Sequence, residues 1–211
     1  MASTLESLPG ARIVSVSADA AVDAPGGGST PFAGVGLTGA VVVSAACRPG
    51  GRSAITLVGP GEGFGFDALG PGSPTARGPA APGCVRGFVA SRILLIPATS
   101  ADAAIAQRPA AAAALLQVLT HHAERTERRL IRTLTLPLTD RLLAELRELS
   151  VTFGRPVPGG RRIELPLTQD VLADLVGAVR ESVNRALRTL AAGGALARTA
   201  SSYVVLDPPE R

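Results

Sequence analysis

The sequence contains no lysine and no tryptophan, and it has one tyrosine, two cysteines and two histidines. Aromatic residues make up only 3% of its 211 residues, which argues against an aromatic surface that stacks single-stranded nucleic-acid bases. Two cysteines and two histidines exclude a four-cysteine zinc or iron–sulfur site and a histidine-rich metal centre. No histidine stands at a recognisable catalytic spacing from a serine, cysteine or carboxylate. We therefore expect no enzyme, no catalytic residue, no metal and no cofactor.

Long apolar runs are also missing, because no stretch approaches the roughly 18 apolar residues that suggest a membrane span. The first residues, MASTLESLPG, lack a charged start followed by an apolar run. We therefore expect no signal peptide, no membrane partner and a cytoplasmic location. Cys47 and Cys84 are isolated, and we expect small buried side chains in a reducing compartment, with a redox role as the alternative.

Positive charge is concentrated in the second half of the chain. All 21 basic residues are arginine, and the formal net charge is +4. Residues 1–107 carry six arginines and six acids, whereas residues 108–211 carry fifteen arginines and eleven acids, so the whole excess lies after residue 107. This distribution favours an anionic partner of the second half, most simply nucleic acid, with arginine-rich codon usage as the alternative.

The region from Ala11 to Pro97 is divided by segments rich in glycine and proline, which is typical of short strands joined by turns. We expect a β-sandwich or barrel there. Its most buried strands should be residues 41–43 and 93–96, which are continuous apolar runs. The expected β-type runs are residues 12–16, 35–45, 53–58 and 85–96.

After Pro109 the sequence has almost no glycine or proline, and it predicts a long helix over residues 110–136. Pro137 ends it, and a second amphipathic helix is expected over residues 138–150. Steps of three and four residues place a narrow apolar seam on the long helix, which favours pairing with a second copy of the chain. The seam consists of Leu116, Leu119, Ala123, Thr126, Leu130 and Thr133.

Two short helices joined by a glycine turn are expected near the C-terminus. Thr168 is a good N-cap for a helix over Gln169–Val176, Gly177 and Ala178 form the turn, and a second helix covers residues 180–191. This pattern predicts a helix-turn-helix. Residues 161–165 before it and 202–206 after it are expected to be strands that make the hairpin of a winged helix.

One face of the second helix carries Arg180, Glu181, Asn184, Arg185 and Arg188. Arginine can fork onto guanine and glutamate can accept a hydrogen bond from cytosine, so this face suits the base edges of double-stranded DNA. The alternative is that these side chains only pair with one another along a solvated helix. The preceding capped helix, the turn and the flanking strands favour DNA recognition.

The segment LTQDVLADLVGAVRESVNRALRTL resembles the DNA-binding motif of the Crp–Fnr superfamily, which includes the cyclic-AMP receptor protein. LPLTDRLLAELRELS resembles the hinge and first helix of that family's C-terminal domain. VGLTGAVVVSAACRPGGRSAITLVGPGEGFGF resembles the glycine-spaced strands of its effector domain. The resemblance implies an α+β chain with a β-roll (jelly-roll) domain over residues 1–108, a dimerisation helix and hinge over 109–137, and a winged-helix DNA-binding domain over 138–211.

The resemblance also implies site residues. Arg180, Glu181 and Arg185 match positions that read a TGTGA-like half-site. Thr168 and Ser182 match positions that contact phosphate, and we expect Asn184 and Arg188 to do so as well. Val179 departs from the family pattern, where serine or threonine is frequent, so one phosphate contact is expected to be missing.

The cyclic-nucleotide cassette of the family is degenerate in this chain. The glutamate that should follow Gly65 is Phe66, which we interpret as a core residue filling the vacated pocket. Thr75 stands where the cassette has arginine, and Arg77 is displaced by two residues. Thr126 matches a position that touches adenine. A cyclic nucleotide would leave its charge poorly paired here, so we expect that cyclic AMP does not gate this protein.

The resulting hypothesis is a homodimeric, sequence-specific transcription regulator on a palindromic TGTGA-like operator, with RNA polymerase as a candidate partner. In one alternative, an unidentified small molecule or partner protein repositions the winged helices about residues 136–138. In another, the protein is a binding module with only electrostatic affinity for DNA.

Overall fold

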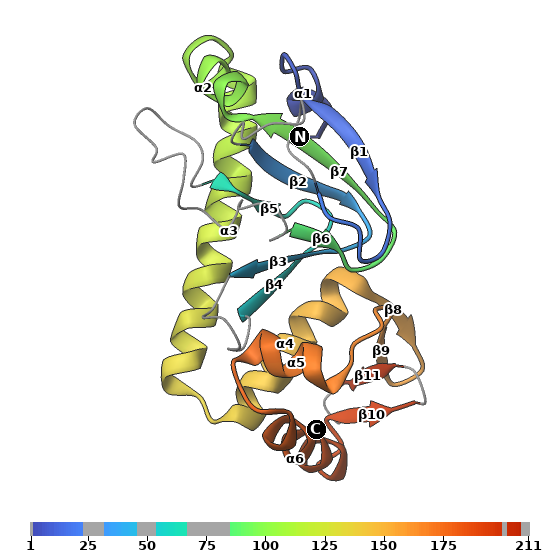
Figure 1. The fold of residues 1–211 in the computed structure, drawn as a ribbon. Coiled ribbons are helices and arrows are strands. Elements are labelled where there is room, and N and C mark those ends of the chain that lie inside the picture. The colour runs from blue at the N-terminus through green and yellow to red at the C-terminus, as the bar shows by residue number, and fades with distance from the viewer. Residues whose placement is uncertain (1, 23–31, 46–53, 67–84, 200–201, 208–211) are drawn as a thin grey trace. The chain divides into compact units, whose positions relative to one another are not determined.

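The computed structural model of the chain describes residues 2–22, 32–45, 54–66, 85–199 and 202–207, and Figure 1 shows its fold. The chain divides into two compact units, Met1–Glu127 and Arg128–Arg211. The fold is α+β, as predicted: antiparallel sheets come first, then the long helix α3 (Pro109–Thr135), then a helix-turn-helix with flanking strands. In the part of the chain that is described, no helix is long and apolar enough to span a membrane.

The described residues of the first unit form two antiparallel sheets and three helices. Helix α1 (Ala2–Glu6) precedes the sheets, and α2 (Ala98–Gln107) and α3 follow them. One sheet has the order β1-β7-β2-β5 and the other the order β4-β3-β6. The strands are β1 (Arg12–Val16), β2 (Phe32–Thr38), β3 (Val41–Ala45), β4 (Ala54–Val58), β5 (Gly63–Phe64), β6 (Val85–Gly87) and β7 (Ser91–Pro97).

Strand β7 is buried on both faces, which explains its continuous apolar run. Ile93 and Leu95 belong to a cluster that both sheets share, whereas Leu94 and Ile96 pack with residues of α1, α2 and α3. All four side chains are inaccessible to solvent. A strand with two covered faces has no reason to alternate polar and apolar residues, so the prediction that residues 93–96 are deeply buried is confirmed.

The structure corrects three details of the strand predictions. Residues 35–45 form two strands in different sheets, because Gly39 turns the chain with a positive φ of 73°. Residues 85–96 form β6 and β7, separated by residues 88–90. Of the valines at 41–43, only Val41 is buried: Val43, on the same face of β3, is half-buried against the inter-sheet core, and Val42 lies on the other face. Helices α1 and α2 and strand β5 were not predicted.

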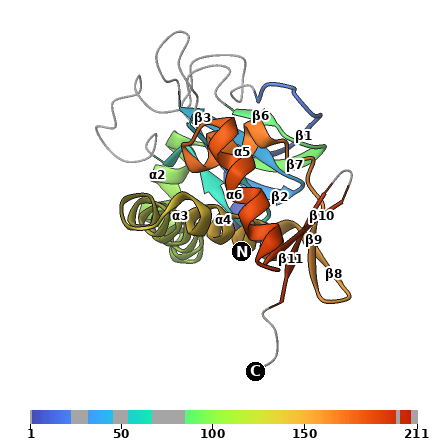
Figure 2. The same ribbon diagram turned by 90° about the horizontal axis from the view of Figure 1, so that it is seen from below.

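The second unit consists of the end of α3, three helices and a four-stranded sheet of order β10-β11-β9-β8 in its described residues. Helix α4 (Leu138–Phe153) buries Leu142, Leu146 and Leu149 beneath α5 (Gln169–Val176) and α6 (Arg180–Ala192). Figure 2 shows α5, α6 and the sheet of this unit together. The strands are β8 (Gly154–Val157), β9 (Gly160–Ile163), β10 (Leu196–Arg198) and β11 (Tyr203–Leu206).

The two strands that flank the helix-turn-helix pair with each other as predicted, but they do not form a hairpin. The strands at 161–165 and 202–206 correspond to β9 and β11, which are neighbours in the sheet but are far apart in sequence. The hairpins are β8–β9 and β10–β11. Both missing partners are short, and β8 contains Pro156, so neither showed a clear strand pattern.

Candidate nucleic-acid interface

Helices α5 and α6 form a helix-turn-helix whose ends are set by local signals. The Thr168 side chain accepts a hydrogen bond from the Val171 amide at 3.2 Å and caps α5. Gly177 takes the left-handed conformation, with φ 61° and ψ 44°, and ends the helix. Val179 is extended and precedes α6, without a side-chain cap. These boundaries agree with those predicted from the sequence.

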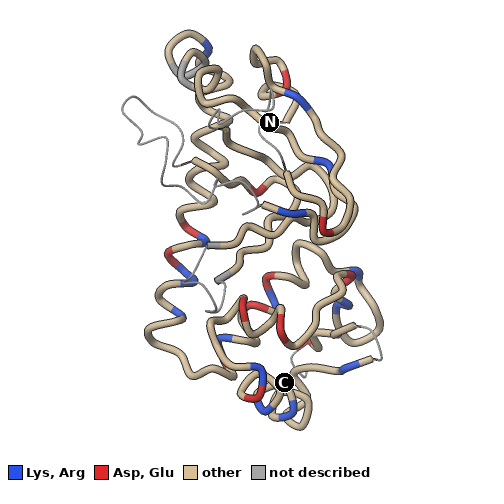
Figure 3. Tube along the Cα trace, in the orientation of Figure 1, with Lys and Arg blue, Asp and Glu red and all other residues tan. Residues whose placement is uncertain are grey.

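The buried face of α6 fixes which of its side chains reach solvent. Val183, Ala186, Leu187 and Leu190 are buried in the core of the second unit. Because these positions repeat at steps of three and four, the intervening positions form one outward face. On that face Arg180, Glu181, Arg185 and Arg188 are exposed, and Ser182 and Asn184 are half-buried. Figure 3 shows the charged residues of α6 gathered along this helix.

Two side chains from the first turn of α5 contact the outward face of α6. Asp170 Oδ2 lies 3.2 Å from Arg180 Nη1. Gln169 donates from Nε2 to Asn184 Oδ1 at 3.4 Å. Arg180 and Asn184 are one helical turn apart, so both contacts support the same face. No sequence pattern indicated this support, because the partners are ten and fifteen positions apart.

A hollow of about 450 Å³ lies beside this face, where the N-terminal turns of α5 and α6 meet strands β10 and β11. Its lining includes Arg180, Arg198, Asp170, Thr168, Thr199 and Ser202. Sequence reasoning missed Arg198 and Thr199. An arginine in a short strand after a helix-turn-helix was the available signal, but β10 itself was not recognised.

Tyr203 of β11 also lines the hollow, and the ionisation of its phenol makes the stability of the second unit depend on pH. Burial raises the pKa of its phenol above the ordinary value of 10.0, an effect that the positive charge of Arg198 partly offsets. The unfolded chain ionises this group near its ordinary pKa, whereas the folded chain keeps the proton to higher pH. The contribution of the protonated Tyr203 phenol to the free energy of unfolding is therefore complete below pH 10, and it is lost as the pH rises through the pKa of the folded state.

We expect a spectrophotometric titration of the native protein to place the phenolate midpoint above 10.0. The signal belongs to Tyr203 alone, because the sequence has a single tyrosine. The denaturation midpoint of the wild type should be lower at a pH above that value than at a pH below it. The midpoint of Tyr203→Phe should change less between the same two conditions. A native midpoint at or below that of the unfolded chain would contradict the burial argument.

Arginines tie the last two turns of α3 to α4 and α5. Arg132 Nη1 lies 2.7 Å from Glu148 Oε1 of α4, and Arg128 Nε lies 3.9 Å from the same oxygen. The Arg129 guanidinium donates to the carbonyl of Leu175, at the C-terminal end of α5. In return, Arg141 of α4 donates to the Thr133 carbonyl at 3.2 Å. This arginine brace (Arg128, Arg129, Arg132 and Arg141) spans the break at Pro137.

The predicted seam of α3 is exposed in the single chain. Leu116, Leu119 and Leu130 are 62%, 42% and 57% accessible. Ala123, Thr126 and Thr133 are exposed as well. Isolated exposed leucines are ordinary, but a row of them along one helix is not, so the seam is an apolar surface that calls for a partner.

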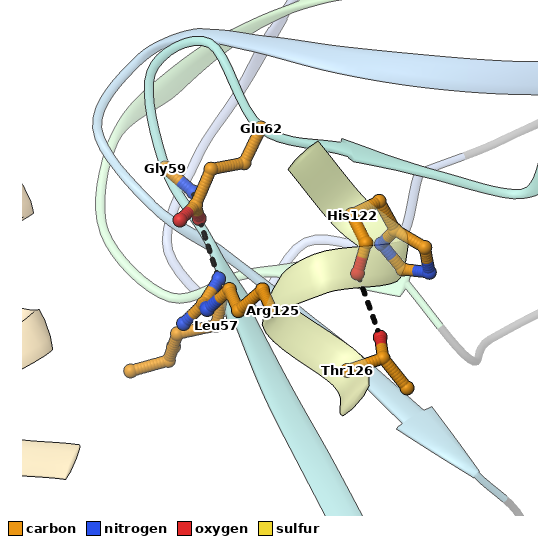
Figure 4. Close-up of polar contacts among 6 residues, drawn as sticks. All are labelled: Leu57, Gly59, Glu62, His122, Arg125 and Thr126. Atoms are coloured by element: carbon orange, nitrogen blue, oxygen red, sulfur yellow. Dashed lines mark hydrogen bonds and ion pairs between the residues drawn. The ribbon is translucent and has the colours of Figure 1, made fainter. Parts of the chain in front are cut away.

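Phe66, which the sequence predicts to lie in a degenerate effector region, lies against α3. Phe66 is half-buried, packs on the core formed with α1, α2 and α3, and meets the His122 ring edge-on at a centroid distance of 5.6 Å. Gly65 is buried with φ 74°. Thr126 is exposed and donates its hydroxyl proton to the His122 carbonyl at 2.9 Å, as Figure 4 shows. Thr75, Arg77, Cys47 and Cys84 lie outside the described residues.

A second polar contact in this region was not anticipated from the sequence. Glu62, just before β5, is an almost fully buried carboxylate that lies 2.7 Å from Arg125 Nη1 of α3 (Figure 4). The same carboxylate accepts from the Gly59 amide at 2.8 Å, and Arg125 also donates to the Leu57 carbonyl at 2.9 Å. Glu62 and Arg125 therefore join the turn between β4 and β5 to the long helix. Within the described residues, no three histidine, cysteine or acidic side chains gather as a metal site.

Comparison with known sequences gives consistent matches. A family model described as a Crp-like helix-turn-helix domain matches residues 141–210. The chain is 29% identical over 177 residues to the CRP-like cAMP-activated global transcriptional regulator of Mycobacterium tuberculosis (strain H37Rv), covering 81% of this chain and 74% of that protein. It is 28% identical over 121 residues to the global nitrogen regulator of Synechocystis sp. (strain PCC 6803), covering 57% of this chain and 54% of that protein.

Solved structures resemble the chain over nearly its whole length. A CRP/FNR-family transcriptional regulator from Thermus thermophilus is 27% identical, with a TM-score of 0.70 and coverage of 93% of this chain and 94% of that one. The c-di-GMP responsive global regulator CLP of Xanthomonas campestris has a TM-score of 0.72 at 21% identity, covering 94% of this chain and 95% of that one. At this lower identity, the second similarity concerns the fold alone.

Proposed function

Because the chain belongs to the Crp–Fnr superfamily of transcription regulators and carries its DNA-binding helix-turn-helix, we propose that it binds a palindromic TGTGA-like operator as a homodimer, without cyclic AMP. Its relatives are transcription regulators, a family that does not act by catalysis, so its function is binding. The proposal includes a cytoplasmic location and RNA polymerase as a candidate partner.

The outward face of α6 is the observation that carries the proposal. Arg180, Glu181 and Arg185 are exposed together on the side opposite the buried Val183 and Leu187. An arginine can donate two parallel hydrogen bonds to guanine O6 and N7, and a glutamate can accept one from cytosine N4. We assign base contacts to these three residues. Phosphate contacts are assigned to the flanking polar residues Thr168, Ser182, Asn184 and Arg188.

Dimerisation through α3 supports recognition of a palindrome. Two copies related by a two-fold axis would present two α6 helices to successive major grooves, with half-sites about 34 Å apart. The exposed seam supplies the contact, because Leu116, Leu119 and Leu130 would each exchange water for a copy of the same side chain or its neighbour. The apolar area removed from water would then stabilise the pair.

The side chains of the expected effector region support the proposal that the protein binds DNA without cyclic AMP. Phe66 stands where a ribose-binding carboxylate would be needed, and its ring packs against His122. Thr126 directs its hydroxyl back to its own helix. The guanidinium of Arg125 already contacts Glu62 and the Leu57 carbonyl. The relative from Mycobacterium tuberculosis is described as cAMP-activated, so cyclic AMP is nevertheless the first ligand to test.

The test is fluorescence anisotropy of the wild type on a duplex with two TGTGA-like half-sites and on a scrambled duplex, with and without cyclic AMP. We expect selective binding that the nucleotide does not change. Arg185→Ala or Arg180→Ala should lose about 1–3 kcal/mol of discrimination between the duplexes, because each removes a bidentate base contact. Arg188→Ala is the matched control. It should weaken binding to both duplexes alike, and it should lower by about 1 the slope of log affinity against log salt concentration.

Three outcomes would contradict parts of the proposal. Binding that falls steeply with salt but shows no sequence preference would mean that the DNA affinity is only electrostatic. Selective binding that requires cyclic AMP would mean that the effector region accepts a nucleotide despite Phe66. Selectivity that survives both arginine substitutions would mean that α6 does not read the bases.

A further inference from the structure

We propose that Asp170 is a specificity-determining residue, whose carboxylate holds the Arg180 guanidinium in the orientation that reads a base. The inference rests on the proposed function, since it concerns how α6 discriminates between DNA sequences. Asp170 belongs to α5 and is not among the residues expected to touch DNA. It acts through Arg180 and is therefore a positioning residue.

The geometry places the two side chains face to face across the helix-turn-helix. Asp170 lies in the first turn of α5, and Arg180 is the first residue of α6. Asp170 Oδ2 is 3.2 Å from Arg180 Nη1, within reach of a charge-assisted hydrogen bond. The neighbouring Gln169 contacts Asn184 one turn further along α6. Consecutive residues of α5 thus support consecutive turns of the outward face.

The chemistry of the guanidinium explains how such a contact can select a base. Arginine has five N–H donors in a fixed plane. A hydrogen bond from Nη1 to Asp170 restricts the orientations of that plane and leaves the edge formed by Nη2 and Nε free to donate two parallel hydrogen bonds. An unsupported arginine at the same place would turn freely toward phosphate oxygens, which attract it regardless of sequence.

The electrostatic position of Asp170 supports the same conclusion. Its carboxylate borders the hollow that Arg180 and Arg198 also line, next to the residues assigned to phosphate. A negative charge there repels the DNA backbone and weakens binding to every sequence. Asp170 therefore opposes general affinity while it orients Arg180. Both side chains are about 60% exposed, so the pair contributes little to folding, and its loss should act on recognition.

A double-mutant cycle tests the inference. The DNA probes are an operator that the wild type itself selects from a random duplex pool, and a scrambled version of it. Dissociation constants are measured for the wild type, Asp170→Asn, Arg180→Ala and the double variant, and the readout is the ratio of scrambled to operator values. Asp207→Asn is the control, because it removes the same charge from another exposed position of the second unit.

We expect Asp170→Asn to bind scrambled DNA more tightly. It should lower the ratio of the scrambled to the operator dissociation constant about fivefold, which is the effect expected from the loss of a well-oriented exposed ion pair. In the Arg180→Ala background the same substitution should leave the ratio unchanged, since no guanidinium remains to be oriented. Asp207→Asn should not change the ratio. The thermal midpoint should stay near that of the wild type for all variants.

Two results would overturn the inference while leaving the proposed function intact. One is a selective wild type whose ratio does not respond to Asp170→Asn. The other is an equal drop in the ratio with and without Arg180, which would mean that Asp170 affects specificity by a route that does not involve the Arg180 guanidinium. A wild type that selects no sequence from the pool would overturn the proposed function itself, and this inference with it.

Discussion

Replacing Leu119 and Leu130 together by glutamate is expected to convert the proposed homodimer to a monomer of 21.3 kDa. Both side chains are exposed on the seam of α3, and in a symmetric pair each would face its counterpart or a neighbouring apolar residue. The substitution removes that apolar contact and places like charges opposite each other. We also expect the affinity for a palindromic duplex to fall by on the order of 100-fold or more, because two linked half-site contacts become independent.

Sedimentation and anisotropy on the same samples measure both effects. Gln117→Glu is the control: this residue is exposed on another face of the same helix, so the added charge should leave the dimer and the affinity unchanged. A double variant that remains dimeric would place the contact between copies elsewhere than on the seam. A monomer that keeps full affinity would mean that the operator is not read as a palindrome.

Glu62→Ala is expected to lower the free energy of unfolding of the first unit by about 3–5 kcal/mol. The Glu62 and Arg125 side chains are only 11% and 14% accessible, so the substitution leaves a nearly buried guanidinium without its carboxylate. It also removes the acceptor of the Gly59 amide. Urea denaturation followed by far-ultraviolet circular dichroism measures the loss.

The matched control is Glu164→Ala, which removes the carboxylate of the ion pair with Arg155 at 3.5 Å. Both of those side chains are more than half exposed, so the expected loss is about 0–1 kcal/mol. Equal effects of the two substitutions would show that burial does not determine how much the Glu62–Arg125 ion pair contributes to the free energy of unfolding. The variant Glu62→Ala/Arg125→Met should recover part of the loss, because no uncompensated charge is then buried.

The helix-turn-helix was predicted almost residue by residue because its signals are local. Thr168 caps a helix within three residues, Gly177 ends it by a backbone conformation that glycine accepts, and apolar spacing identifies the buried face of α6. The long helix was predicted for the same reason. Each of these features depends on residues that lie within about one or two helical turns of one another.

Features that depend on distant residues could not be read from the sequence. Glu62 and Arg125 are 63 positions apart, and each looks like an ordinary surface charge until the fold brings them together. The pairing of β9 with β11 across the helix-turn-helix was predicted and is present, but their hairpin partners β8 and β10 were missed. The roles of Arg180, Glu181 and Arg185 at base edges, and of Phe66 in the effector region, stay predictions.

The arginine brace restricts movement between α3 and α4, which the break at Pro137 would otherwise leave as a flexible connection. Arg132 and Arg129 hold the helix end to Glu148 of α4 and to the Leu175 carbonyl of α5. A rotation of this end about its own axis would therefore be transmitted to α6 rather than absorbed at Pro137. In the proposed dimer, the winding of the two α3 helices around each other would set the distance between the recognition helices. Substitutions in the seam could then alter the preferred length of the operator spacer without touching DNA.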